Sequence, residues 1–172
     1  VYAKYGYCHN YLTEIRLLGA KGIGQIANIM SHLRENAIER VGAFDVLEKI
    51  DRWQGDPQPH LSRTDKSSRN VLILKLKPLP GTRGIRVTVR PSGTEPKFKI
   101  YIEVLGQPFD SADGDSIKSS IIKIREQLER DFMRDCYRIL GVDFPERGFL
   151  LFWQLPLDDK MHYFNIEETL AG

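Results

Sequence analysis

IRVTVRPSGTEPKFKIYIEV, residues 85–104, contains two runs in which apolar and polar residues alternate. The apolar positions are Ile85, Val87 and Val89 in the first run and Phe98, Ile100, Ile102 and Val104 in the second. A period of two is typical of strands that bury one face of a sheet. The sequence therefore predicts two half-buried strands joined by a loop over residues 90–97.

Another strand is predicted near the N-terminus of the chain. Over residues 11–18, Leu12 and Leu18 would lie on one face and Ile15 and Leu17 on the other. Two glycines after this strand, Gly19 and Gly22, indicate a turn. The apolar residues that follow recur at helical spacing, which predicts an amphipathic helix with a stripe of Ile23, Ile26, Ala27, Met30, Leu33 and Ala37.

Three further segments complete the predicted fold. Residues 43–53 fit a strand or a helix, and a strand is favoured; residues 71–77 alternate clearly and predict a strand. Between them, residues 53–70 are polar and rich in Pro and Ser, as a long surface loop is. A second long helix is predicted from a cap at Ser111 or Asp113 to Gly141, with a stripe of Ile117, Ile121, Ile124, Leu128 and Phe132. This order of elements predicts a two-layer α+β domain, with helices on one face of a mainly antiparallel sheet.

Composition narrows the class of protein. The chain has 172 residues, enough for one domain with a sizeable core. Two cysteines provide no disulfide framework, so a reducing, cytoplasmic setting is expected. The net charge is +2, and residues 142–172 hold six acidic against two basic residues. The resulting mild basic excess in residues 1–141 fits binding of one or two small anions better than binding of nucleic acid. No apolar run is long enough to span a bilayer, so no membrane partner is expected.

The loop of residues 90–97 has the composition of an anion site. Pro91 and Pro96 stiffen its ends, and Gly93 permits backbone conformations that other residues avoid. We expect the amides of Ser92, Gly93 and Thr94 to converge on one point. Arg90 adds a guanidinium suited to phosphate, and Lys97 and Lys99 lie nearby. The same residue types also occur in ordinary hairpin turns, so composition alone leaves both interpretations open.

Other motifs are weaker. Residues 19–24 are rich in glycine and open a helix but lack the Gly-Lys-Ser/Thr ending of a phosphate-binding P-loop. Residues 110–115 resemble the start of a calcium loop, yet Ile121 stands where the bidentate Glu is needed. The four histidines have no partners at metal-ligand spacing. No metal site is therefore expected in this chain.

Residues 90–97, Arg-Pro-Ser-Gly-Thr-Glu-Pro-Lys, resemble the phosphate-binding signature in the last domain of the α-D-phosphohexomutases, which include phosphoglucomutases and phosphomannomutases. The resemblance covers about residues 1–135. Asp65-Lys66-Ser67-Ser68 is similar to the branch that contains phosphoglucomutase-2-like enzymes and phosphopentomutases. The resemblance implies a TATA-box-binding-protein-like fold and a phosphate grip formed by Arg90, Ser92, Gly93 and Thr94, with Lys97 and Lys99 as neighbours.

The resemblance also implies a function. In such enzymes a phosphoserine in the first domain exchanges its phosphoryl group with a sugar phosphate, aided by Mg²⁺. The last domain holds the phosphate that is not reacting. The sequence contains no serine loop and no Asp-rich metal loop. We therefore expect the catalytic groups, the Mg²⁺ site and the sugar selectivity in upstream domains, and expect this chain alone to be inactive. The alternative is a free-standing, non-catalytic anion-binding or interaction module of the same fold.

The expected organisation has three parts: a hinge or end of a preceding domain in residues 1–10, the phosphate-binding domain in residues 11–141, and a tail in residues 142–172. The expected partners are a sugar phosphate or bisphosphate and the upstream domains. No regular element is predicted in the tail. Its aromatic cluster of Phe149, Phe152 and Trp153 needs a partner surface, so we expect the tail to dock on its own domain.

Overall fold

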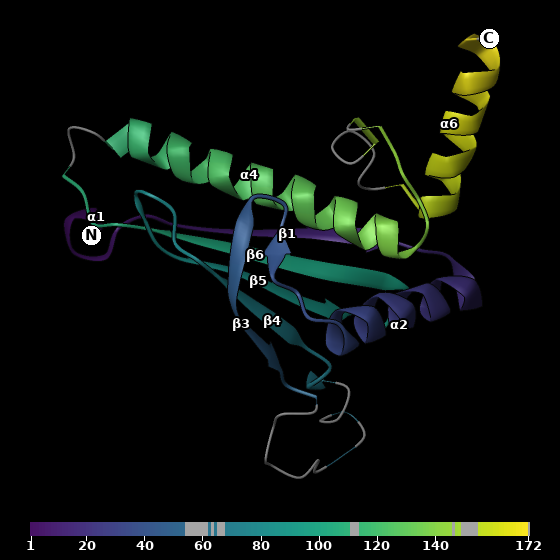
Figure 1. Ribbon diagram of the computed structural model, residues 1–172, viewed down its shortest axis with the longest axis horizontal. Coiled ribbons are helices and arrows are strands. Elements are labelled where there is room, and N and C mark those ends of the chain that lie inside the picture. The colour runs from purple at the N-terminus through teal and green to yellow at the C-terminus, as the bar shows by residue number, and fades with distance from the viewer. Residues whose placement is uncertain are drawn as a thin grey trace.

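An antiparallel sheet forms one layer of the fold, and two long helices form the other (Figure 1). The computed structural model describes residues 1–53, 62, 64, 68–110, 114–145, 147–148 and 155–171. Within them the elements are α1 (Tyr2–Tyr5), β1 (Cys8–Arg16), α2 (Gly19–Glu35), β2 (Arg40–Val41), β3 (Phe44–Asp51), β4 (Leu72–Leu76), β5 (Thr82–Pro91), β6 (Lys97–Gly106), α4 (Gly114–Ile139) and α6 (Leu157–Ala171).

The six described strands lie side by side in the order β1-β6-β5-β4-β3-β2, and each pairs antiparallel with its neighbour. Helix α4 packs on β6 and β1, and α2 contacts both β6 and α4. The predicted two-layer α+β class is confirmed, and it is consistent with the fold that the resemblance implied. Residues 43–53, which fitted either element, form strand β3.

Strands β5 and β6 direct alternate side chains to opposite sides of the sheet. The apolar set faces the helices and is at most 3% exposed: Ile85, Val87, Val89, Phe98, Ile100, Ile102 and Val104. Burying each of these side chains contributes about 1.5–3 kcal/mol before entropy is counted. The polar set lies on the other side of the sheet, called here the open face, where Thr88 and Tyr101 are half-buried.

Helix α2 starts at Gly19, so the turn expected at Gly19 and Gly22 is wrong. Gly22 lies inside the helix, where a Cβ atom would stand 2.7 Å from the Cβ of Leu17. The missing side chain therefore lets the helix fold back closely on the end of β1. The buried face of α2 comprises Gly22, Ile26, Ile29, Met30 and Leu33, whereas the predicted core residues Ile23 and Ala27 are exposed.

Strand β1 begins at Cys8 and ends at Arg16, three residues earlier at its start than predicted. The predicted faces are confirmed, because Ile15 and Leu17 are buried while Leu12 and Leu18 are exposed. Helix α4 ends at Ile139, close to the expected end, and Gly141 two residues later has φ +72°. The predicted caps Ser111 and Asp113, and with them half of the calcium-like stretch, lie outside the described residues, as do Asp65–Ser67.

The tail contains a helix, α6, that the sequence did not predict. Phe144 and Phe164 are buried, and Phe144 packs between the rings of Tyr137 and Phe164 with centroid distances of 5.3 Å to each. The Lys160 ammonium lies 3.0 Å from the Tyr137 hydroxyl of α4. The described part of the tail thus docks on the end of α4, as expected (Figure 1). Phe149, Phe152 and Trp153 lie outside the described residues.

Candidate functional site

The loop from Ser92 to Pro96 connects β5 to β6 and is held at both ends by backbone hydrogen bonds. The Ser92 amide donates to the Lys97 carbonyl at 2.8 Å, and the Lys97 amide donates to the Glu95 carbonyl at 2.7 Å. The Pro96 carbonyl accepts a hydrogen bond from the Leu17 amide at 3.0 Å, which joins the loop to the end of β1. The position of the loop is therefore fixed by two strands and two prolines before any ligand binds.

These hydrogen bonds show that the expected convergence of three amides on one point is wrong. The Ser92 amide is already committed within the hairpin, so it cannot also point at an anion. Among the described residues, the amides of Gly93 and Thr94 have no backbone partner. The backbone of Gly93 is not left-handed, contrary to its expected role. Nothing lies within 4 Å of the place where its Cβ would be, so this stretch of backbone is open to close approach.

Four basic side chains meet at this end of the sheet, but they are not equivalent. The Lys97 ammonium lies 3.3 Å from Glu14 and 2.7 Å from Glu95, and the Arg16 guanidinium lies 2.7 Å from Glu14. The hydrogen bond to Glu95 raises the pKa of Lys97, and the same bond lowers the pKa of Glu95. Lys97 therefore stays charged, but two carboxylates offset its charge locally.

Arg90 and Lys99 form no hydrogen bond or ion pair with the described part of the chain. They are cross-strand neighbours on the open face, at the last positions of β5 and the first of β6 before the loop. The hydroxyls of Ser92 and Thr94 also have no partner among the described residues. All six predicted site residues thus lie together, and Arg90 is a guanidinium available for a bidentate contact with an oxyanion.

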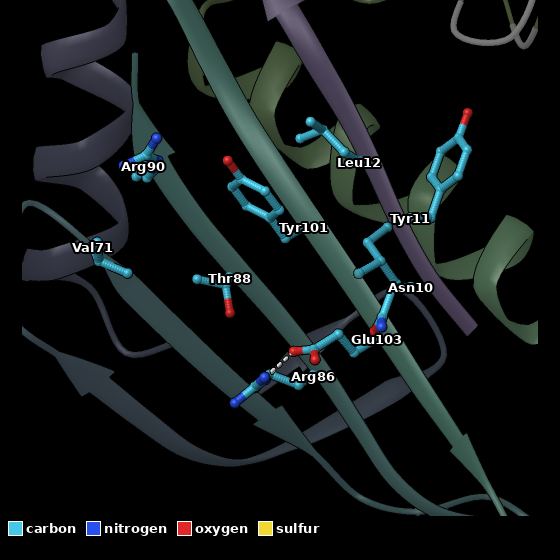
Figure 2. Close-up of a pocket in the computed structure, with 10 residues that line it drawn as sticks. Asn10, Tyr11, Leu12, Val71, Arg86, Thr88, Arg90, Tyr101 and Glu103 are labelled. Atoms are coloured by element: carbon cyan, nitrogen blue, oxygen red, sulfur yellow. Dashed lines mark hydrogen bonds and ion pairs between the residues drawn. The ribbon is translucent and has the colours of Figure 1, made fainter. Parts of the chain in front are cut away.

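A shallow depression of about 550 Å³ continues from Arg90 along the open face. Figure 2 shows the Tyr101 ring between Arg90 and Leu12, with Thr88 beside it on β5. At the far end, Arg86 forms an ion pair with Glu103. The alternation of residues 85–90 predicts outward positions for Arg86 and Thr88, but sequence reasoning missed Glu14, Tyr101 and the depression. The alternation in β6 could have placed Tyr101 beside Thr88, whereas Glu14 gave no local signal.

The described residues do not provide a ligand set that fits Mg²⁺. Among them, no three His, Cys, Asp or Glu side chains gather in a way that could hold a metal ion. His9 instead lies 3.1 Å from the Tyr7 hydroxyl, and burial together with Arg125 lowers its pKa. Cys136 is buried and Cys8 exposed, both as free thiols. None of the described helices is long and apolar enough to cross a membrane.

Comparison with known proteins relates the chain to phosphomutases. No family model matches the chain. It is 30% identical over 110 residues to a probable phosphomannomutase of Haemophilus influenzae, covering 63% of this chain and 19% of that protein. It is 28% identical over 110 residues to a phosphoglucomutase of Staphylococcus aureus, covering 64% of this chain and 20% of that protein. It is also 28% identical over 144 residues to a phosphopentomutase of Mus musculus, covering 78% and 22%.

The chain therefore spans about a fifth of the length of the curated relatives it matches. All three relatives are mutases of sugar phosphates by name, which confirms the resemblance that residues 90–97 predicted. A match to about a fifth of each relative is consistent with one domain of a larger polypeptide, such as the C-terminal domain of the phosphohexomutase superfamily.

Proposed function

We propose that this chain is the C-terminal phosphate-binding domain of a phosphohexomutase, and that it holds the phosphate that is not reacting during intramolecular phosphoryl transfer. The observation that carries the proposal is the free guanidinium of Arg90 next to the open backbone of Gly93 and Thr94. These groups lie on a loop whose ends are fixed by hydrogen bonds. The similarity to three kinds of phosphomutase supports the same role.

The hydrogen-bond donors of Arg90 and the loop suit the binding of a phosphate. The Arg90 guanidinium donates two hydrogen bonds to phosphate oxygens, and the Gly93 and Thr94 amides and the Ser92 and Thr94 hydroxyls donate the others. A grip on a remote phosphate uses binding energy to position the reacting end of the substrate. Because the loop recognises a phosphate and not the sugar, it can hold either end of a bisphosphate that turns around.

The remaining parts of the reaction would come from other domains. These are the serine that carries the phosphoryl group and the carboxylates that hold Mg²⁺, which supplies charge neutralisation at the transferring phosphoryl group. We expect this chain alone to lack mutase activity. Closure of this domain on the others would exclude water from the phosphoenzyme.

The test is Arg90→Ala in the larger polypeptide that carries this chain. Loss of the charge-assisted contacts, worth about 1.5–3 kcal/mol, should lower kcat/KM for isomerisation of a hexose phosphate by about 10- to 100-fold. Arg83→Ala, at an exposed arginine near the other end of β5, is the matched control and should leave kcat/KM unchanged. If Arg90→Ala leaves kcat/KM normal, the grip is not where we place it.

A further inference from the structure

A buried carboxylate lies among the basic side chains at the phosphate grip. Glu14 of β1 is 9% exposed, and its Oε1 lies 2.7 Å from the Arg16 Nε and 3.3 Å from the Lys97 Nζ. An anion site gains affinity from positive charge, and a nearby carboxylate opposes that gain. Glu14 has no hydrogen-bond donor to offer a phosphate while it is ionised. Its position therefore requires a role other than direct binding of the phosphate.

The register of the sheet places Glu14 close to the grip. Glu14 is the cross-strand partner of Lys99, and Lys99 is the partner of Arg90, so the three residues form one row across the sheet. Neighbouring strands are about 4.8 Å apart, which puts the backbones of Glu14 and Arg90 about 10 Å from each other. The carboxylate of Glu14 therefore lies within about one Debye length of a phosphate held by Arg90.

The charges around the grip are more balanced than the count of basic residues suggests. Four cationic and two acidic side chains lie at this end of the sheet: Arg16, Arg90, Lys97, Lys99, Glu14 and Glu95. Lys97 is paired with both carboxylates and Arg16 with one. The net charge of the set is two positive charges, about the opposite of the charge on a phosphate monoester. The grip can thus neutralise a bound phosphate without an excess of positive charge.

We propose that Glu14 limits the affinity of the grip for phosphate, so that the phosphate leaves the loop fast enough for turnover. The inference rests on the proposed function, in which the loop releases one phosphate of a bisphosphate and then binds the other. Binding energy that is equal in the substrate and the transition state lowers KM without raising kcat. Tighter binding of this kind slows each step in which the loop must let go of its ligand. Glu14 acts through its charge and does not touch the phosphate.

The first test compares the affinities of the wild-type and Glu14→Gln chains for methyl phosphate, followed by NMR at the amides of Gly93 and Thr94. Methyl phosphate is a dianion at about pH 7.5, since the second pKa of a phosphate monoester is about 6. Glutamine keeps the shape and a hydrogen-bond acceptor but removes the charge. We expect Glu14→Gln to bind methyl phosphate about fivefold more tightly. A purely structural role for Glu14 predicts weaker or unchanged binding instead.

Methyl sulfate gives a second readout, because it has the shape of methyl phosphate but one negative charge. Glu14→Gln should tighten the binding of methyl sulfate only about twofold, since the repulsion is proportional to the charge of the ligand. A structural change in the loop would alter the affinity for both ligands alike.

Glu103→Gln is the matched control. Glu103 is also paired with an arginine of the neighbouring strand, Arg86, and it lies on the same open face (Figure 2). It stands six residues along β6 from Lys97, which is about 20 Å, so salt screens its charge from the grip. The affinity of Glu103→Gln for methyl phosphate should equal that of the wild-type chain.

A second carboxylate keeps the inference testable if Glu14→Gln does not fold. Glu95→Gln removes the other carboxylate that is paired with Lys97. The Glu95 side chain is 56% exposed, so its charge is screened more strongly than that of Glu14. Glu95→Gln should therefore tighten the binding of methyl phosphate about twofold.

The second test measures turnover in the larger polypeptide that carries this chain. Glu14→Gln should lower both KM and kcat for isomerisation of a hexose phosphate by about threefold, because the phosphate leaves the loop more slowly. Glu103→Gln should change neither constant. Tighter binding of methyl phosphate together with an unchanged kcat would refute the role of Glu14 in release.

The titrations also separate this inference from the proposed function. Unchanged or weaker binding of methyl phosphate in Glu14→Gln, with saturable shifts in the loop of the wild-type chain, would overturn the inference and leave the grip intact. No shift in residues 92–95 of the wild-type chain would overturn the grip itself, and the inference with it.

Discussion

Among the described residues, Lys160 and Arg90 both lack an ion pair with an acidic side chain, but their surroundings differ completely. Arg90 is half-buried on the open face, whereas Lys160 is 1% exposed under the tail helix and lies next to the Tyr137 hydroxyl. Burial lowers the pKa of Lys160 from 10.5 to about 8. A half-buried guanidinium that reaches the open face can bind a ligand, whereas a buried ammonium makes the stability of the fold sensitive to pH.

The lowered pKa of Lys160 predicts the sign of that sensitivity. The folded chain binds this proton less tightly than the unfolded chain, so the charged lysine destabilises the fold below about pH 8. The free energy of unfolding should therefore rise as pH increases from about 8 towards 10, by on the order of 2 kcal/mol. Lys160→Met removes this contribution, because methionine is unbranched and uncharged.

Thermal unfolding of both proteins at about pH 7 and about pH 9.5 measures the effect. We expect the difference in Tm between Lys160→Met and the wild-type chain to shrink as pH rises. A difference that is independent of pH would mean that Lys160 does not titrate in this range.

Single residues of the candidate site were predictable where their chemistry is local. Arg90, Lys97 and Lys99 follow from the motif, and the structure places all three at one end of the sheet. Which of them is free could not be predicted, because Lys97 is paired with Glu14, a residue 83 positions away in the sequence. The hydrogen bond from the Ser92 amide to the Lys97 carbonyl was missed for a related reason. This bond depends on the register of the hairpin, which the composition of the loop does not reveal.

At the scale of elements, Gly22 and Gly24 in the first half of α2 lead to opposite predictions. A Cβ on Gly22 would lie 2.7 Å from the Leu17 Cβ and 2.8 Å from the Leu17 carbonyl carbon, whereas a Cβ on Gly24 would meet nothing within 4 Å. Gly22→Ala should therefore lower the free energy of unfolding by about 1–3 kcal/mol. Gly24→Ala should raise it by about 0.5–1 kcal/mol, since alanine favours the helix.

Urea denaturation of the two variants measures both changes in one experiment. Because the residues are two positions apart in one helix, each variant is the control for the other. Equal effects of the same sign would contradict the close packing of α2 on the end of β1.

Elements with a clear period were predicted well, and those without one were not. Strands β4, β5 and β6 follow from alternation, and α4 follows from its apolar stripe and Gly141. The start of α2 was misplaced because glycines usually indicate turns, while here Gly22 serves a close contact. Helix α6 was missed because its apolar residues surround the helix: Phe164 is buried, and Ile166 and Leu170 are exposed.

At the scale of the whole molecule, the groups that we assign to phosphate binding lie together at one end of the sheet. The β5–β6 loop, the end of β1 and the uncommitted Arg90 meet there, and the depression of the open face starts at the same place. The fold class could be predicted from patterning alone. The depression could not, because it depends on the register of three strands, β1, β6 and β5.

The division of residues 1–10, 11–141 and 142–172 into hinge, domain and tail stays a prediction. Strand β1 begins inside the first of these segments, and α6 packs its buried face on α4. An ion pair of 3.1 Å between Lys21 and Asp158 also joins α2 to α6. These contacts make the tail part of the same packed unit in the described residues.

The measurement that tests the central claim most directly is a titration of the 172-residue chain with inorganic phosphate, followed at every backbone amide by NMR. A few charge-assisted bonds to one phosphate predict a Kd on the order of 1 mM. We predict the largest shifts at Gly93 and Thr94, a smaller shift at the committed amide of Ser92, and loss of all three in Arg90→Ala but not in Arg83→Ala. Saturable shifts at another basic surface, with none in residues 92–95, would contradict the assignment of this loop as the phosphate site.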